Sequence, residues 1–180
     1  HAQADTGQMM LSVSKALPEI DAQAWALMEI KSGWVVAAVN AEQPLAPASI
    51  TKLMTTYVVF DELEKGRISL ADEVAISEKA WRSEGSRMFA DVNTRIGLEH
   101  LLKSTIIQSG NDAAIALAEH VSGTEERFAA QMNQHAERLN LRQTHFENAT
   151  GLPAQGHQMS PVDILKLSAA LINDFPQYYP

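Results

Sequence analysis

The sequence predicts one mixed α/β domain, of the α+β kind, in which a β-hairpin is followed by a series of helices. The first observation is the length of 180 residues, which suits one domain. The second is the composition, because 46% apolar and 20% charged residues are ordinary for a globular protein. The third is the order of the patterns, since two apolar stretches around a glycine precede a run of helical apolar repeats.

The first predicted element is a hairpin. Residues 25–30 and 34–39 are apolar stretches that flank Lys31, Ser32 and Gly33, which is typical of two strands joined by a glycine turn. These are the only strands that the pattern predicts. Because a two-stranded hairpin alone is not a stable sheet, we expect further strands to cover it.

Helices follow the hairpin. The pattern predicts a helix over residues 49–65 that is apolar on most sides and therefore belongs in the core, with Pro47 and Gly66 as stop signals. Further helices are predicted at residues 98–108, 112–121 and 125–140. A last helix begins after Ser160, an N-cap residue followed by proline, and runs to about residue 174.

Composition and charge argue against several functions. Fourteen basic and twenty-two acidic residues give a net charge of −8, which repels phosphate backbones, so we expect no nucleic-acid partner. The chain has no cysteine and its six histidines form no H-x-x-x-H pair, so we expect no metal and no cofactor. The histidines are expected at surface or capping positions. No apolar run exceeds the six residues of 34–39, which is far shorter than the roughly 20 residues that span a bilayer.

A serine and a lysine at the start of the predicted core helix have the spacing of a catalytic pair. Ser49 and Lys52 stand at i and i+3, so both side chains project from one face of a helix, one turn apart. A buried lysine with a lowered pKa can take the serine proton and make the hydroxyl a nucleophile. Ser49 also lies near a helix N-terminus, where N–H groups stabilise a developing oxyanion. The pair predicts acyl transfer through Ser49.

The S-x-x-K spacing needs a second element, because it arises by chance about once in a chain of this size. It recurs at Ser12, where no helix-start signal follows, and we interpret that match as chance. Ser109, Gly110 and Asn111 supply a second hydroxyl and a carboxamide at the break between two predicted helices. The hydroxyl can relay a proton to a leaving amine, and the amide can bond the lysine and a substrate peptide group.

Three segments carry a resemblance to a known family. They are Pro47-Ala48-Ser49-Ile50-Thr51-Lys52, Gly85-Ser86-Arg87-Met88-Phe89 and Ser109-Gly110-Asn111-Asp112. In this order they resemble the serine-type D-alanyl-D-alanine carboxypeptidases, low-molecular-mass penicillin-binding proteins of the β-lactamase/transpeptidase-like family. The resemblance covers residues 21–180 and leaves residues 1–20 as an N-terminal segment. It implies an α+β fold with a helical region beside an antiparallel sheet, which is incomplete in this chain.

The resemblance implies roles for individual residues. Ser49 would be the acylated nucleophile and Lys52 its base, with Ser109 and Asn111 as the second catalytic element. The substrate-binding residues that it implies are Ser86, Arg87 and Gly110.

The resemblance also implies an activity and a place of action. The reaction would be hydrolysis of the terminal D-Ala-D-Ala bond of peptidoglycan stem peptides, with β-lactam antibiotics acylating the same serine. The location would be periplasmic or otherwise extracytoplasmic and associated with the cell envelope. Association with a membrane would then require a segment that these 180 residues do not contain.

The sequence departs from the family pattern in its third motif. No K-T-G or K-S-G follows Asn111, and Lys31-Ser32-Gly33 has the letters but precedes the first motif, so we interpret it as a turn. We therefore expect these 180 residues to be the N-terminal part of a larger catalytic domain. Thr150 stands where relatives often carry histidine, and it is given no role.

Two alternative functions stay open. A class A β-lactamase shares the first two motifs but needs a glutamate in the pattern E-x-x-x-N, and the nearest approach here is Glu137 with Asn140, three residues apart. A non-catalytic domain that binds penicillin or cell-wall peptides would also keep two motifs and lack the third.

Overall fold

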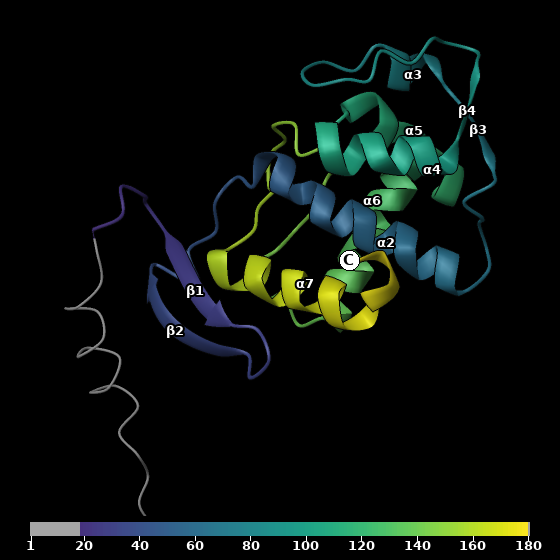
Figure 1. The fold of residues 1–180 in the computed structure, drawn as a ribbon. Coiled ribbons are helices and arrows are strands. Elements are labelled where there is room, and N and C mark those ends of the chain that lie inside the picture. Colours follow the sequence, from purple (N-terminus) through teal and green to yellow (C-terminus); the bar gives the residue numbers. More distant parts are fainter. Residues whose placement is uncertain (1–18, 180) are drawn as a thin grey trace, which may run out of the picture.

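The structure is a computed structural model that describes residues 19–179. In it a helical body carries two small antiparallel sheets at different places on its surface (Figure 1). The elements in chain order are β1 (Trp25–Glu29), β2 (Trp34–Val39), η1 (Ala48–Thr51), α2 (Lys52–Glu64), β3 (Glu73–Ala75), α3 (Glu78–Trp81), β4 (Arg95–Gly97), α4 (Leu98–Lys103), η2 (Ser104–Gln108), α5 (Asn111–Ser122), α6 (Glu125–Arg138), α7 (Pro161–Asp174) and η3 (Pro176–Tyr178). The second match to S-x-x-K, at Ser12, lies outside the described residues.

The predicted hairpin is confirmed. Strands β1 and β2 pair antiparallel, and the register shifts between Leu27 and Met28. The carboxylate of Glu29 accepts hydrogen bonds from the backbone N–H groups of Lys31 and Ser32, which closes the turn. The hairpin lies beside α7 at the edge of the helical body (Figure 1). Lys31-Ser32-Gly33 is therefore a turn at a distance from the other motifs in the chain.

Helix α2 forms the centre of the core, as its all-round apolar pattern predicts. It contacts α5, α6 and α7, and Figure 1 shows it running through the middle of the body. Nine of its residues are buried, among them Met54, Tyr57 and Val58, each at most 1% exposed. The predicted start at Ser49 needs one correction, because the first turn is the 3₁₀ helix η1 and the α-helix begins at Lys52. A tighter first turn is common at helix N-termini.

A second small sheet adds two strands that no pattern in the sequence predicted. Strands β3 and β4 pair antiparallel, with Val74 opposite Ile96. Each strand has three residues, which is too short for an alternating pattern to separate from chance. The pairing brings the chain back to Leu98, whose backbone N–H donates to the Asp72 carbonyl. The sheet thus fixes where helix α4 begins.

The later helices agree with the sequence except where two of them break. The predicted helix 98–108 is α-helical to Lys103 and then widens into the π turn η2, which ends at Ser109 in a left-handed conformation. Helix α6 ends at Arg138, two residues before the predicted end. Helix α7 begins as predicted, because the Ser160 hydroxyl accepts the backbone N–H of Asp163. Within residues 19–179 no helix is long and apolar enough to cross a bilayer.

Candidate active site

Ser49 and Lys52 meet at the junction of η1 and α2. The Lys52 Nζ atom lies 3.4 Å from Ser49 Oγ, and it also donates to Asn111 Oδ1 and to the Thr150 carbonyl, both at 2.8 Å. A neutral amine has two N–H groups and one lone pair. If the two short hydrogen bonds use both N–H groups, the lone pair is left for the Ser49 hydroxyl. This geometry suits a lysine that removes the serine proton.

The electrostatic environment favours that neutral form. Lys52 is only 5% exposed, and burial lowers the pKa of its amine to about 8. Desolvation disfavours the charged form of a lysine, and the direct partners of Nζ are neutral oxygens. A base is most effective when its pKa is close to the working pH. Lys52 therefore has the protonation behaviour that its position requires.

The side chain of Asn111 is oriented from its other end. Its amide nitrogen donates to the Glu84 carbonyl at 2.6 Å, and its backbone N–H donates to the Ser86 carbonyl at 2.7 Å. With the nitrogen held there, the amide oxygen must face Lys52. Gly85 fits between these contacts because its φ is +77° and an added Cβ would lie 3.0 Å from Asn111 Nδ2. The loop around Gly85 therefore sets the orientation of Asn111.

Ser109 supplies a second hydroxyl, which borders the same cavity as Ser49 and Lys52. It ends the π turn with φ of 56°, and its Oγ atom is buried without a hydrogen-bond partner among residues 19–179. A cavity of about 620 Å³ is bordered by Ser49, Lys52 and Ser109, with an otherwise mostly apolar wall. That wall includes Ile50, Leu53, Phe60, Ile106, Leu171, Ile172, Tyr178 and Tyr179. The three candidate side chains Ser49, Lys52 and Ser109 thus border one largely apolar groove, which we name the Ser49 groove.

The remaining sequence-predicted residues lie beside this group rather than in it. The hydroxyl of Ser86 donates to the Gln108 carbonyl at 2.6 Å, so it is turned toward backbone. The guanidinium of Arg87 stacks over the Phe89 ring at 4.9 Å. Gly110 has no room for a side chain, because a Cβ there would lie 2.6 Å from the Ser104 hydroxyl. None of these three residues borders the Ser49 groove.

Sequence reasoning missed the segment that packs against the motif turn. The Thr150 carbonyl binds Lys52, and Gly151 approaches so closely that a Cβ would lie 1.8 Å from the Ala48 oxygen. Gly151 has φ of +86°, which glycine adopts without strain. Every residue has a backbone carbonyl, so the identity of residue 150 does not indicate that its carbonyl accepts a hydrogen bond from Lys52. Only Gly151 could have indicated a close approach of the two segments.

The expectation that the histidines lie on the surface is wrong for two of them. His135 is 7% exposed and His157 is 6% exposed. His157 lies against Thr51, inside the motif turn, with 2.7 Å between its Nε2 atom and the threonine hydroxyl. The sequence signal for this placement is weak, because residues 145–158 fold back on themselves and only the fold brings that segment to α2.

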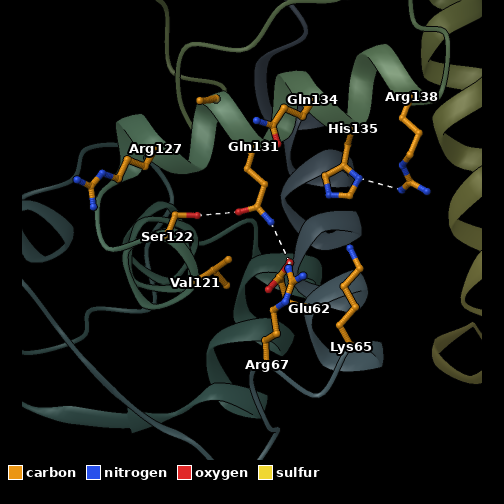
Figure 2. Close-up of a pocket in the computed structure, with 11 residues that line it drawn as sticks. Glu62, Lys65, Arg67, Val121, Ser122, Arg127, Gln131, Gln134, His135 and Arg138 are labelled. Carbon is orange, nitrogen blue, oxygen red and sulfur yellow. Dashed lines mark hydrogen bonds and ion pairs between the residues drawn. The ribbon is translucent and has the colours of Figure 1, made fainter.

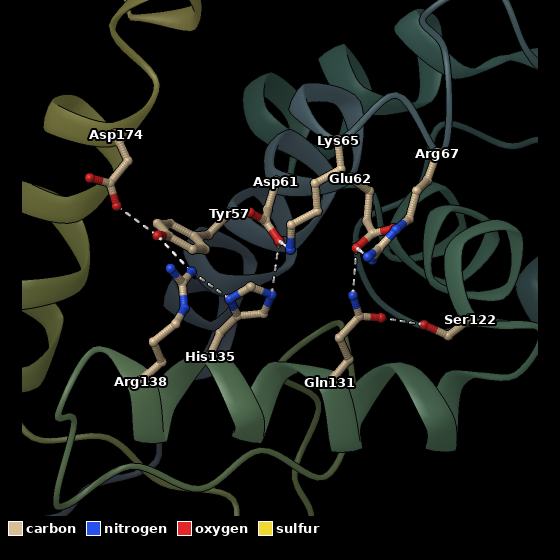
Figure 3. A network of polar contacts seen from close by, with 10 residues as sticks. All are labelled: Tyr57, Asp61, Glu62, Lys65, Arg67, Ser122, Gln131, His135, Arg138 and Asp174. Carbon is tan, nitrogen blue, oxygen red and sulfur yellow. Dashed lines mark hydrogen bonds and ion pairs between the residues drawn. The ribbon is translucent and has the colours of Figure 1, made fainter.

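A second, polar cavity of similar volume lies at the far end of α2, and Figure 2 shows the residues that line it. Several of its charged side chains are paired within the network drawn in Figure 3, where Arg67 pairs with Glu62 and Lys65 with Asp61, and the Ser122 hydroxyl donates to Gln131. Arg138 donates to the Tyr57 hydroxyl, whose own proton goes to Asp174. The cavity therefore presents no hydroxyl with a free base beside it. The network instead ties α2, α6 and α7 together.

Known proteins match this chain in sequence and in fold. A family profile described as D-alanyl-D-alanine carboxypeptidase matches residues 11–180. D-alanyl-D-alanine carboxypeptidase DacD of Salmonella typhimurium is 41% identical over 168 residues, which are 90% of this chain and 43% of the relative. Crystal structures of penicillin binding protein 5 from Haemophilus influenzae are similar with a TM-score of 0.88, at 39% identity over 91% of this chain and 48% of that chain.

A more distant structure carries an antibiotic. Penicillin-Binding Protein D2 from Listeria monocytogenes in its ampicillin-bound form has a TM-score of 0.79 and 25% identity, over 89% of this chain and 66% of that chain. These likenesses confirm the predicted fold class, with helices beside small antiparallel sheets. The chain spans less than half the length of the curated relatives it matches.

Proposed function

The chain belongs to the D-alanyl-D-alanine carboxypeptidase family, and from this premise we propose that the whole protein is a serine D,D-peptidase that acts on peptidoglycan stem peptides. The observation that carries the proposal is the position of the Lys52 amine. It is buried, hydrogen-bonded to two neutral oxygens, and 3.4 Å from the Ser49 hydroxyl. In this family, that arrangement fits cleavage of the terminal D-Ala-D-Ala bond through an acyl-enzyme on Ser49.

The first half of the reaction forms the acyl-enzyme. Neutral Lys52 takes the Ser49 proton as Oγ attacks the scissile carbonyl, and a bond forms between Oγ and the carbonyl carbon. When the C–N bond breaks, the departing amine of the terminal D-alanine must gain a proton. The Ser109 hydroxyl is placed to give its proton to that amine and to regain one from protonated Lys52, which returns the lysine to its neutral form. It borders the same cavity, and its oxygen has no protein partner among the described residues. Asn111 holds Lys52 in place through the short bond to its Oδ1.

The second half is hydrolysis. A water molecule attacks the ester carbonyl, Lys52 accepts the water proton, and the bond to Ser49 Oγ breaks with return of the proton to the serine. A β-lactam would follow the first half and stall in the second, because its amine stays tethered to the acyl group in the opened ring. We propose that penicillins acylate Ser49 for this reason. We also propose that Ser86 and Arg87, in the loop that holds Asn111, and Gly110, next to Asn111, border the part of a stem peptide that extends beyond the Ser49 groove.

The proposal includes a location. Stem peptides of peptidoglycan lie outside the cytoplasm, so the whole protein would act there, in the periplasm or at the cell envelope. The homologues carry names of cell-wall enzymes, which supports extracytoplasmic action. Localisation of the tagged natural protein by cell fractionation tests this part separately.

The test of the activity is labelling of the full-length natural protein with a fluorescent penicillin, followed by mapping of the modified peptide. We expect the label on Ser49 and a complete loss of label in Ser49→Ala. The matched control is Ser12→Ala, which removes the serine of the second S-x-x-K sequence and should label as the parent does. Undiminished labelling of Ser49→Ala would refute the proposed nucleophile, and absence of D-alanine release from a D-Ala-D-Ala peptide would refute the reaction.

A further inference from the structure

A buried histidine bridges the motif turn and the segment that packs on it. The His157 Nε2 atom lies 2.7 Å from the Thr51 hydroxyl, and its Nδ1 atom accepts the backbone N–H of Glu147 at 2.9 Å. Thr51 is fully buried, and in the sequence of the turn it stands between Ser49 and Lys52. His157 does not border the Ser49 groove, so it does not face a substrate there.

The backbone contact determines which ring nitrogen carries the proton. A backbone N–H is always a donor, so Nδ1 must be the acceptor and the proton of a neutral imidazole must be on Nε2. Nε2–H then donates to the Thr51 hydroxyl oxygen. Both nitrogens are satisfied in this single tautomer. A second proton on Nδ1 would point at the Glu147 N–H and remove its hydrogen bond.

The surroundings of His157 do little to stabilise its protonated form. Burial is the main influence on His157 and lowers the pKa of its imidazole below 6.5, while the Glu147 carboxylate raises it and His145 lowers it further. Glu147 is occupied by His145, whose Nε2 lies 2.9 Å from its carboxylate. From η1, the group that contacts the ring is the neutral Thr51 hydroxyl, and the Lys52 amine one residue on has Ser49, Asn111 and Thr150 as its partners. Protonation therefore breaks a buried contact without a new one to replace it.

The same segment holds the catalytic lysine. We name residues 145–158 the clamp segment, because backbone hydrogen bonds between His145 and Gln158 close it into a loop. Its hydrogen bonds to η1 and the first turn of α2 include the His157–Thr51 bond, the Thr150 carbonyl on Lys52 and the Ala149 carbonyl on Thr55. Opening the Glu147–His157 contact loosens one side of this loop. The position of the Thr150 carbonyl, and with it the Lys52 amine, depends on that loop.

We propose that His157 is a positioning residue for acylation: in its neutral form it holds the Ser49–Lys52 turn against the clamp segment, and in its protonated form it releases it. The inference rests on the proposed function, because acylation of Ser49 is its readout. It makes the clamp segment an acid-sensitive support of the active site, separate from the ionisation of Lys52 itself.

The test is the rate of penicillin acylation of the full-length natural protein between about pH 4.5 and pH 9. The pKa of the Lys52 amine is about 8, and burial lowers the pKa of His157 from its usual value. In the parent, the logarithm of the rate should fall with a slope of one below the pKa of Lys52 and steepen toward two once His157 protonates. His157→Gln keeps a donor that reaches Thr51 but cannot titrate. Because it lacks the acceptor for the Glu147 N–H, it should acylate several-fold more slowly than the parent at pH 8. Its acid limb should keep a slope of one, so that its rate relative to the parent rises toward pH 4.5.

Two further variants separate positioning from simple packing. His157→Asn can accept the Glu147 N–H but is too short to reach Thr51, so it should acylate about tenfold more slowly at every pH, since one missing hydrogen bond is worth roughly that factor. His145→Gln removes the exposed histidine of the same segment and should keep the steep acid limb of the parent. Tryptophan fluorescence in the same buffers checks that the proteins remain folded.

The failures of the two proposals are distinguishable. A parent protein that penicillin never labels would overturn the proposed function. A labelled parent whose acid limb is unchanged in His157→Gln would overturn the role of His157 and leave the function intact. An independent readout is the ¹⁵N spectrum of the imidazole, which should show a neutral ring protonated on Nε2 at pH 7. A ring protonated on Nδ1, or charged at that pH, would contradict the proposal whatever the activity.

Discussion

At the scale of single residues, the chemistry depends on whether Lys52 can lose its proton. Arginine keeps the positive charge but cannot deprotonate at accessible pH. We expect Lys52→Arg to lower the acylation rate at least about 100-fold, in the range typical of a lost general base, and to remove its rise with pH. The parent rate should rise as pH increases through about 8, because the amine is the active form and burial lowers its pKa to that value.

The control for this substitution is Lys65→Arg, at the other end of the same helix. Lys65 is an exposed partner of Asp61, and arginine preserves that ion pair. Its acylation profile should match that of the parent. If Lys52→Arg acylates nearly as fast as the parent across the pH range, the lysine serves only as a fixed positive charge.

Asn111 offers a second test at this scale, because its amide oxygen lies 2.8 Å from the amine. Asn111→Asp places a carboxylate there, which stabilises the ammonium form and raises the pKa of Lys52, by about 1 to 3 units for an opposite charge so close. The rise of the acylation rate should therefore move to higher pH than in the parent. A variant that loses rate without any alkaline displacement of the profile would show that the amide acts in another way.

The sequence could predict the side chains to which we assign chemistry, but not the groups that support them. Ser49, Lys52, Ser109 and Asn111 are recognisable because the reaction needs those functional groups at those spacings. The Thr150 carbonyl is a backbone group, available at any residue, and only the fold selects it. For the same reason the Asn111 orientation, which depends on the Glu84 carbonyl, could not be inferred from residue identities.

At the scale of elements, the close approach of the clamp segment to the motif turn is the most sensitive contact. Gly151→Ala combines a disfavoured φ of +86° with a Cβ that would lie 1.8 Å from the Ala48 oxygen. We expect a loss of about 3 kcal/mol in the free energy of unfolding, as for overpacking with backbone strain, and a marked fall in acylation. Thermal unfolding and penicillin labelling of the same samples measure both.

Gly66→Ala is the matched control for this prediction. Gly66 also has a positive φ, of +66°, but nothing lies within 4 Å of the added Cβ. Only the strained backbone conformation should lower its free energy of unfolding, by about 1 kcal/mol. It should acylate as the parent does. Equal effects of the two substitutions would mean that backbone strain, and not the contact with Ala48, explains the first.

The elements that the sequence predicted are those with many buried residues or a clear end signal. Helix α2 is recognisable from its apolar length, and α7 from Ser160 at its N-cap. Strands β3 and β4 carry three residues each, so their pairing depends on tertiary contacts rather than on a local pattern. The π turn before Ser109 likewise has ordinary helix-forming residues, and its widening is visible only in the structure.

At the scale of the whole molecule, the active site and the main stabilising network occupy opposite ends of α2. Near Ser49 the contacts come from α5, the loop around Gly85 and the clamp segment, whereas Tyr57 and the residues beyond it bind α6 and α7 (Figure 3). The rings of Tyr57, His135 and Phe175 pack edge to face in this second region. Because one rigid helix joins both regions without sharing their polar contacts, stability and chemistry should respond to mutation independently.

Tyr57→Phe tests that independence. Phenylalanine keeps the ring contacts but removes the hydroxyl that donates to Asp174 at 2.6 Å and accepts from Arg138 at 3.1 Å. Burial and the Asp174 carboxylate raise the pKa of this hydroxyl to about 12, so it remains a donor across the physiological range. We expect the free energy of unfolding to fall by about 1 to 2 kcal/mol, as for other buried hydrogen bonds, which lowers the melting temperature by about 2 to 8 °C.

The pH profile of acylation should stay that of the parent, because no contact of Lys52 involves Tyr57. An unchanged melting temperature would remove the network as a source of stability, and an altered acylation profile would show that the two ends of α2 are coupled.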